Sequence, residues 1–240
     1  MSTTALYPYV ADDMGVLIPI DAAYLHGRLS LSEHARGLVI IANGDGDRVY
    51  DATNTFIARR LADAGFGTLV VDLLTPNEAA EDAESSALRF HQSLLATRLI
   101  KVTQWVRARL VFRGLEIGYF ASGLCAGAAL ASASVSANIR SVVCRGARVD
   151  LVVPRLRGVR ASVLLLVGDR DSAHINASRG AFWLLPETAR LEVLPNAGHL
   201  LDEPATLERV ARSAAEWFGD TLDVQLATVD SIDGMLAGVP

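Results

Sequence analysis

The sequence predicts an α/β fold in which helices cover both faces of a doubly wound, mostly parallel central sheet. Two observations lead to this prediction. Short apolar runs alternate along the chain with longer segments of helical pattern, and most runs are almost continuous in Val, Ile and Leu, as in strands buried on both faces. The chain has 240 residues, of which 51% are hydrophobic and 20% charged, and this suits one large packed domain.

The strands of the expected sheet are short and rich in apolar residues. Segment 16–32 predicts a β-hairpin at one sheet edge. The expected buried strands that follow it are 37–43, 67–74, 115–122, 139–146, 162–169 and 189–196.

The helices are expected between these strands, where apolar residues recur at helical spacing. The three predicted helices are 54–65, 87–110 and 203–218. Segment 75–86 is acidic and loosely patterned, which favours a solvated loop.

One domain is expected over residues 1–218, followed by a C-terminal extension at 219–240 whose apolar residues show no clear period. This extension is a candidate contact with a second subunit, so a homodimer is one expected assembly. The net charge of −5 gives no reason to expect nucleic acid or an anionic membrane as a partner. Segment 1–15 lacks the features of a secretory signal, and the longest apolar runs are strand-sized, so a cytoplasmic location is expected.

Chemically useful side chains follow three of the expected strands. A glycine-flanked cysteine, Cys125, lies in the segment Gly-Leu-Cys-Ala-Gly that follows strand 115–122. Asp171 follows the strand that starts at 162, and His199 precedes the last helix. Active groups gather at the carboxyl ends of strands in such sheets. A histidine and a helix N-terminus both favour a reactive thiolate, and an aspartate would hold the histidine in the required tautomer.

These motifs resemble the dienelactone-hydrolase-like family of the α/β-hydrolase superfamily over about residues 16–218. The similar segments include "ADAGFGTLVVDLLTPNE", "LRFHQSLLATRL", "EIGYF", "CRGARVDL" and "AGHLLDEPATLERVARSAAEWF". The resemblance implies the α/β-hydrolase fold and catalytic roles for Asp171 and His199. It also implies a cysteine nucleophile, because dienelactone hydrolases carry one in a similar G-x-C-x-G turn. Backbone amides near Asp45 and Ala126 would then hold the oxyanion.

Two registers of the turn remain open. Cys125 as nucleophile requires the strand to be two residues longer and the helix to start correspondingly later. An alignment without a gap to the closer branch of the family instead places its serine position on Gly123, and glycine tolerates the strained conformation of that turn.

These registers lead to different functions. With Cys125, the protein is an esterase, lactonase or thioesterase that works through an acyl-enzyme. With Gly123, His199 and Asp171 would act as a general base, with Asp45 as a second acid or base, in a lyase, cyclase or isomerase of secondary metabolism. A third interpretation is a non-catalytic binding protein.

The loop after strand 37–43 differs from the His-Gly motif of relatives. It reads Asn-Gly-Asp-Gly-Asp-Arg, and a carboxylate at Asp45 would oppose a developing oxyanion. Asp45 and Asp47 also suit turn or capping roles. A metal site made by these two residues and Asp51 lacks a full calcium-loop pattern, so neither metal nor cofactor is expected.

A small-molecule substrate is expected, and arginines suggest that it is anionic. Guanidinium groups recognise carboxylates in a bidentate manner. The alternative is that the arginines pair with acids such as Asp72 or Asp150. The candidate substrate-binding residues are Gly44, Arg48, Arg89 and Arg145.

Overall fold

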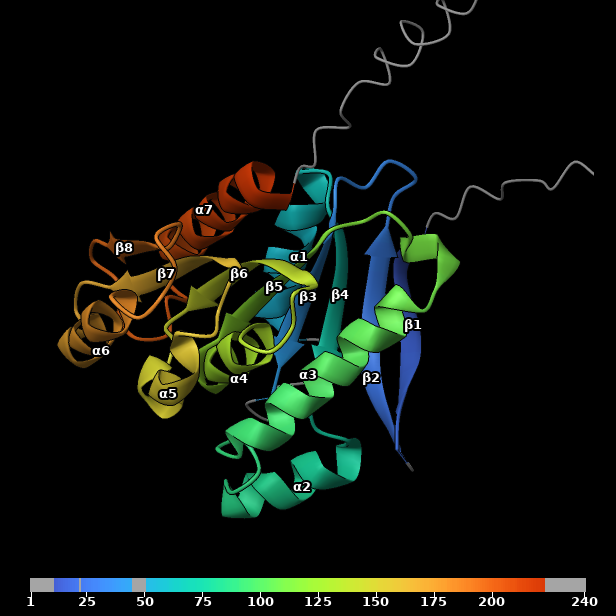
Figure 1. Ribbon diagram of the computed structural model, residues 1–240, viewed down its shortest axis with the longest axis horizontal. Helices are drawn as coiled ribbons and strands as arrows, with labels where there is room; N and C mark the ends of the chain where they lie inside the picture. The colour runs from blue at the N-terminus through green and yellow to red at the C-terminus, as the bar shows by residue number, and fades with distance from the viewer. Residues whose placement is uncertain (1–10, 22, 45–50, 223–240) are drawn as a thin grey trace, which may run out of the picture.

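An eight-stranded sheet forms the centre of the protein, as the computed structural model shows (Figure 1). The structure describes residues 11–21, 23–44 and 51–222. The strands lie in the order β1-β2-β4-β3-β5-β6-β7-β8. They comprise β1 (Ala11–Ile20), β2 (Ala23–Leu31), β3 (Leu38–Asn43), β4 (Gly67–Asp72), β5 (Ile117–Ser122), β6 (Ile139–Arg145), β7 (Ser162–Gly168) and β8 (Arg190–Leu194).

The strand directions confirm the predicted fold class. Strands β1 and β2 form an antiparallel hairpin at one edge, and β2 also pairs antiparallel with β4. All pairings from β4 to β8 are parallel. All six residues of β3 are buried, as expected of a strand covered on both faces. The six predicted central strands match the observed ones to within two residues at each end.

Helices cover both faces of the sheet (Figure 1). One core contains residues of α3, α4 and α6, and the other contains residues of α1 and α7. No described helix has both the length and the apolar character needed to cross a membrane. The helices are α1 (Ala52–Asp63), α2 (Pro76–Ser85), α3 (Gln92–Arg107), α4 (Gly123–Ala133), α5 (Val153–Leu156), α6 (Ser172–Phe182) and α7 (Pro204–Leu222), with short 3-10 turns η1 (Leu110–Phe112) and η2 (Val149–Val152).

Segment 75–86 is a helix, so the prediction of a solvated loop there was wrong. Thr75 and Glu78 form a capping box, in which each side chain bonds the other residue's backbone N–H. Pro76 occupies the first turn, where a missing N–H costs nothing. Glu78 also makes two contacts with Arg98 of α3, at 2.5 and 2.7 Å. Local capping and this ion pair outweigh the weak apolar pattern.

Helix α7 continues through Leu222, four residues past the predicted domain boundary at 218. The remainder of the predicted C-terminal extension, 223–240, lies outside the described residues.

The ion pair between Glu78 and Arg98 makes stability depend on pH. The Arg98 hydrogen bonds lower the pKa of Glu78 from 4.5 to about 2, against the effect of burial. Stabilisation is therefore complete above pH 4.5 and is lost as the pH falls toward 2. We expect Glu78→Gln to lower the free energy of unfolding at pH 7 by roughly 1–2 kcal/mol, and by less at pH 3.

Urea denaturation at both pH values measures this effect. Glu81→Gln, which changes an exposed carboxylate on the same helix, is the matched control. An equal loss of stability from Glu78→Gln at pH 7 and pH 3 would contradict the assignment.

Candidate active site

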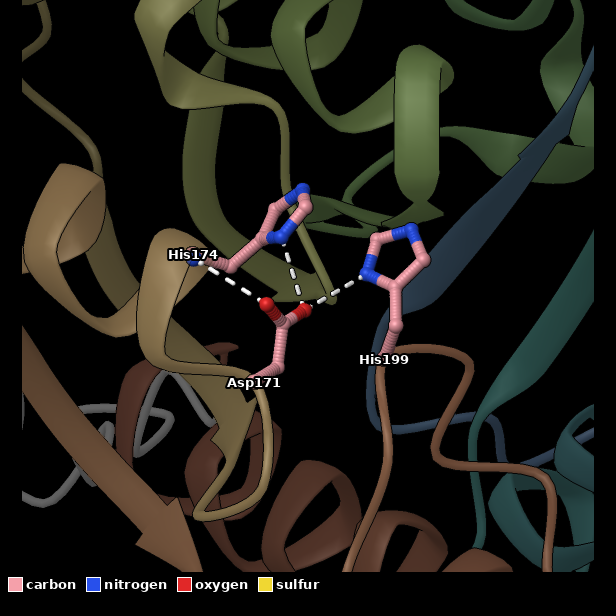
Figure 2. Close-up of side chains that lie close together, drawn as sticks. All are labelled: Asp171, His174 and His199. Atoms are coloured by element: carbon pink, nitrogen blue, oxygen red, sulfur yellow. Dashed lines mark hydrogen bonds and ion pairs between the residues drawn. The ribbon is translucent and has the colours of Figure 1, made fainter.

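His199 and Asp171 meet at the carboxyl edge of the sheet (Figure 2). Asp171 lies in the loop after β7, and His199 lies in the loop after β8. The His199 Nδ1 is 2.9 Å from Oδ2 of Asp171. Asp171 is also the N-cap of α6, because its Oδ1 accepts the backbone N–H of His174 at 3.2 Å. The predicted histidine–aspartate pair is thus brought together with its carboxylate anchored to a helix.

Backbone hydrogen bonds hold the loop that carries His199. The Ala197 N–H donates to the Asp169 carboxylate, and the Gly198 N–H donates to Glu203, each at 3.1 Å. Gly146, at the end of β6, has φ +55°, and a Cβ there would lie 2.6 Å from the carbonyl oxygen of His199. Glycine at this position therefore permits the close approach that sets the height of His199 above the sheet.

A second histidine, His174, contacts the same carboxylate. Its Nδ1 lies 2.7 Å from Asp171 Oδ2, and its ring stacks on that of His199 with centroids 4.1 Å apart (Figure 2). Burial alone would raise the pKa of Asp171, but its interactions with His174 and His199 lower that pKa below its usual value. Sequence reasoning missed His174. Its position three residues after an N-cap aspartate is the signal that could have found it.

The turn between β5 and α4 places Gly123, rather than Cys125, at its apex. Strand β5 ends at Ser122, α4 begins at Gly123, and Gly123 has φ +54°. The longer strand that a Cys125 nucleophile requires is therefore not formed. Cys125 is the third residue of the helix and is 1% exposed. Its Sγ lies 2.7 Å from where a Cβ on Gly44 would be, so the thiol packs against the backbone of Gly44.

A pocket of about 200 Å³ lies beside the histidine–aspartate pair. Its described lining includes Gly123 and His199 but not Cys125. A larger groove of about 570 Å³ lies between α1 and β2, and it contains neither member of the pair, so we take the smaller pocket as the site. The smaller pocket is lined by Asn43, Asp51, Thr53, Asn54, Ser122, Gly123, Arg145, Gly146, His199, Leu200 and Asp202.

Ala126, one of the two predicted oxyanion residues, does not fit this turn. Ala126 is the fourth residue of α4, so its N–H is placed to donate to the Ser122 carbonyl within the helix. The N–H of Leu124, one residue after the apex, lies in the first turn, where helical N–H groups lack intrahelical partners. Asp45 and Arg48 lie outside the described residues.

The two described arginine candidates differ in position. Arg145, at the end of β6, is buried and lines the pocket, and its role in substrate binding stays a prediction. Arg89 does not line the pocket, and it is bound instead by Asp82 of α2, with Nε 2.5 Å from a carboxylate oxygen. Asp82 is fully buried, and its hydrogen bonds from Arg89 and Leu88 lower its pKa against the effect of burial. The substrate role predicted for Arg89 is therefore replaced by a structural one.

Asp72 and Asp150, the acids named as alternative partners of the arginines, each contact another residue. Asp150 binds Arg148 at 2.8 and 2.9 Å, and Asp72 accepts a hydrogen bond from Asn43 at 2.8 Å.

Comparison with solved structures identifies the family. The crystal structure of a dienelactone hydrolase from Anabaena variabilis is 36% identical in sequence, with a TM-score of 0.85. The match covers 89% of this chain and 100% of that one. The chain belongs to the dienelactone-hydrolase-like family. The esterase Est1E from Butyrivibrio proteoclasticus, at 15% identity and a TM-score of 0.71, shares the fold over 86% of this chain and 98% of its own.

A curated relative adds a different description. A Mycobacterium tuberculosis protein, provisionally named a phosphoribosyl transferase, is 42% identical over 197 residues in each of two strains. The match covers 82% of this chain, but the chain spans only 44% of that relative. No protein-family model matches the chain.

Proposed function

We propose that this family member hydrolyses an ester or lactone of a small organic substrate by direct attack of a water molecule that His199 activates. The observation that carries the proposal is the glycine at the apex of the turn. Gly123 lines the same pocket as His199, and His199 is 2.9 Å from Asp171. The acid–base pair of the family is present, while the position of the nucleophile bears no side chain.

The chemistry follows from these groups. Asp171 accepts the Nδ1 proton of His199, which leaves Nε2 free to take a proton from water. The water oxygen attacks the substrate carbonyl, and the oxyanion that forms accepts the N–H of Leu124 at the start of α4. The protonated His199 then returns its proton to the leaving oxygen. No bond to the protein forms at any step.

Cys125 is unsuited to an acyl-enzyme in this arrangement. Its thiol is buried and packs toward Gly44, while the pocket lies beside Gly123. To attack a substrate, Cys125 would have to leave the first turn of α4, at the cost of the helix start.

A lyase, cyclase or isomerase is the second candidate, because such reactions need a base but no nucleophile. The observation that favours it is Arg145, a buried cation in the wall of the pocket. An arginine there suits a substrate carboxylate, whose charge it would neutralise while holding the substrate in place during proton removal. The transferase name of the mycobacterial relative carries no weight here, because the chain spans less than half of that protein.

Hydrolysis in H₂¹⁸O tests the proposal, with p-nitrophenyl acetate and a dienelactone as substrates. We expect the parent protein to place one ¹⁸O atom in the carboxylate product, and intact-protein mass spectrometry to find no acyl adduct during turnover. Cys125→Ala should change kcat/KM by less than about threefold, since a buried methyl-sized change perturbs packing alone.

Three results would contradict the proposal. An acyl adduct on Cys125 would restore the cysteine mechanism. A product formed without ¹⁸O would instead indicate elimination or isomerisation, and the absence of hydrolysis of both substrates would refute the hydrolytic function.

A further inference from the structure

Two histidines share a single carboxylate oxygen in this site, although an acid–base pair needs only one. The Nδ1 atoms of His174 and His199 lie 2.7 and 2.9 Å from Oδ2 of Asp171. Each of the three residues offers one atom that could bind a metal ion, and these atoms all lie within 4.8 Å of one another. Figure 2 shows the two rings side by side, each with its Nδ1 atom turned toward the same carboxylate oxygen.

The contact of His174 is short but is not a hydrogen bond. Both ring nitrogens of His174 are buried, and neither has a hydrogen-bond partner among the described residues. A proton bridges two atoms well only when it lies near the line between them. Two atoms that bind one metal ion instead direct their lone pairs at the ion, which does not lie on the line that joins the two atoms. Buried polar atoms that make no hydrogen bond call for an explanation, such as an ion bound to them.

We propose that Asp171, His174 and His199 bind a divalent transition-metal ion of the Zn²⁺ type. Imidazole nitrogen and carboxylate oxygen are ligands that Zn²⁺ accepts at about 2.0–2.2 Å, usually with three protein groups and a water in an open site. The open position is available because the His199 side chain is 44% exposed. Asp150, which is paired with Arg148, also interacts electrostatically with His174.

The proposal revises the expectation that the chain holds no metal, and it has a consequence for the reaction. A metal ion on Nδ1 of His199 leaves the ring proton on Nε2. The Nε2 atom can then no longer accept a proton from water, so the bound ion inhibits the hydrolysis. This consequence rests on the proposed function, whereas the binding itself does not.

Isothermal titration of the full chain with Zn²⁺ at pH 7.5, without substrate, tests the binding. We expect one ion per chain in the parent and about tenfold or greater weakening in His174→Gln, which removes one ligand. His26→Gln, which changes an exposed histidine on β2, is the control and should bind as the parent does. Mg²⁺ should not compete, because it prefers all-oxygen sites.

A second readout does not depend on any variant folding. The parent titrated with Co²⁺ should develop the intense visible bands of a low-coordinate nitrogen–oxygen site. The absence of saturable Zn²⁺ binding, equal binding by His174→Gln, or a Co²⁺ spectrum identical to that of the hydrated ion would each overturn the site.

The inhibition is measured separately, as hydrolysis of p-nitrophenyl acetate with EDTA and with added Zn²⁺. The parent should be active in EDTA and should lose activity as Zn²⁺ fills the site. Activity that disappears in EDTA would overturn the inhibitory role. Zn²⁺ binding by a protein inactive toward every ester would leave the metal site intact and refute the proposed function alone.

Discussion

Replacing Gly123 with serine is expected to give this protein a covalent acylation step that the parent lacks. Gly123 already has the positive φ, +54°, of the turn apex, and it lines the pocket that contains His199. A hydroxyl at this position would face the base that His199 and Asp171 form. We expect labelling by a fluorophosphonate to rise by about a hundredfold, the scale of catalysis by one positioned base.

The substitution also carries a structural cost. A residue with a Cβ at positive φ costs about 1–3 kcal/mol, so the variant should be less stable than the parent. Gly123→Ala imposes the same backbone strain without a hydroxyl, and it is therefore the matched control. Mass spectrometry of the labelled protein locates the adduct.

The result depends on His199 as well. Combining Gly123→Ser with His199→Ala should return labelling to the level of the parent. Equal labelling of Gly123→Ser and Gly123→Ala, in protein that denaturation shows to be folded, would mean that the apex of the turn does not face the base.

Replacing His199 with alanine should lower kcat/KM for ester hydrolysis by about 10²–10⁴-fold, because among the described residues His199 is the base that both contacts Asp171 and lines the pocket. Asp171→Asn should lower it on a similar scale, since an amide cannot hold the histidine in the required tautomer. The low pKa of Asp171, caused by its two histidine contacts acting against burial, keeps this carboxylate ionised at neutral pH.

Steady-state kinetics with p-nitrophenyl acetate in EDTA measures both losses without interference from metal ions. His34→Ala changes an exposed histidine in the turn after β2, distant in sequence from His199, and should retain the rate of the parent. A His199→Ala variant with more than about a third of parental activity would show that the hydrolysis arises elsewhere, for example from non-specific acyl transfer to surface groups.

The limits of sequence reasoning are visible at three places. Helix α2 was missed because its stability comes from a capping box and an ion pair to α3, and neither depends on apolar spacing. Arg89 was taken for a substrate ligand because its partner, Asp82, becomes buried only once α2 forms. His174 was overlooked because the ring that it contacts, that of His199, is 25 residues away in the chain.

The fold class and the succession of strands could be predicted from the sequence, because both follow from the hydrophobic pattern. The contact of Asp171 with His199 could also be predicted, because parallel strands end at a common edge of the sheet. The register of the turn was decided only by the tertiary structure. Gly123 and Cys125 lie two residues apart in a glycine-rich segment that permits either apex. Pairing of β5 with β6 through Ser122, and packing of α4 from Gly123 onward, select one of them. The thiol is thereby buried in the helix, and the glycine is left in the wall of the pocket that His199 also lines.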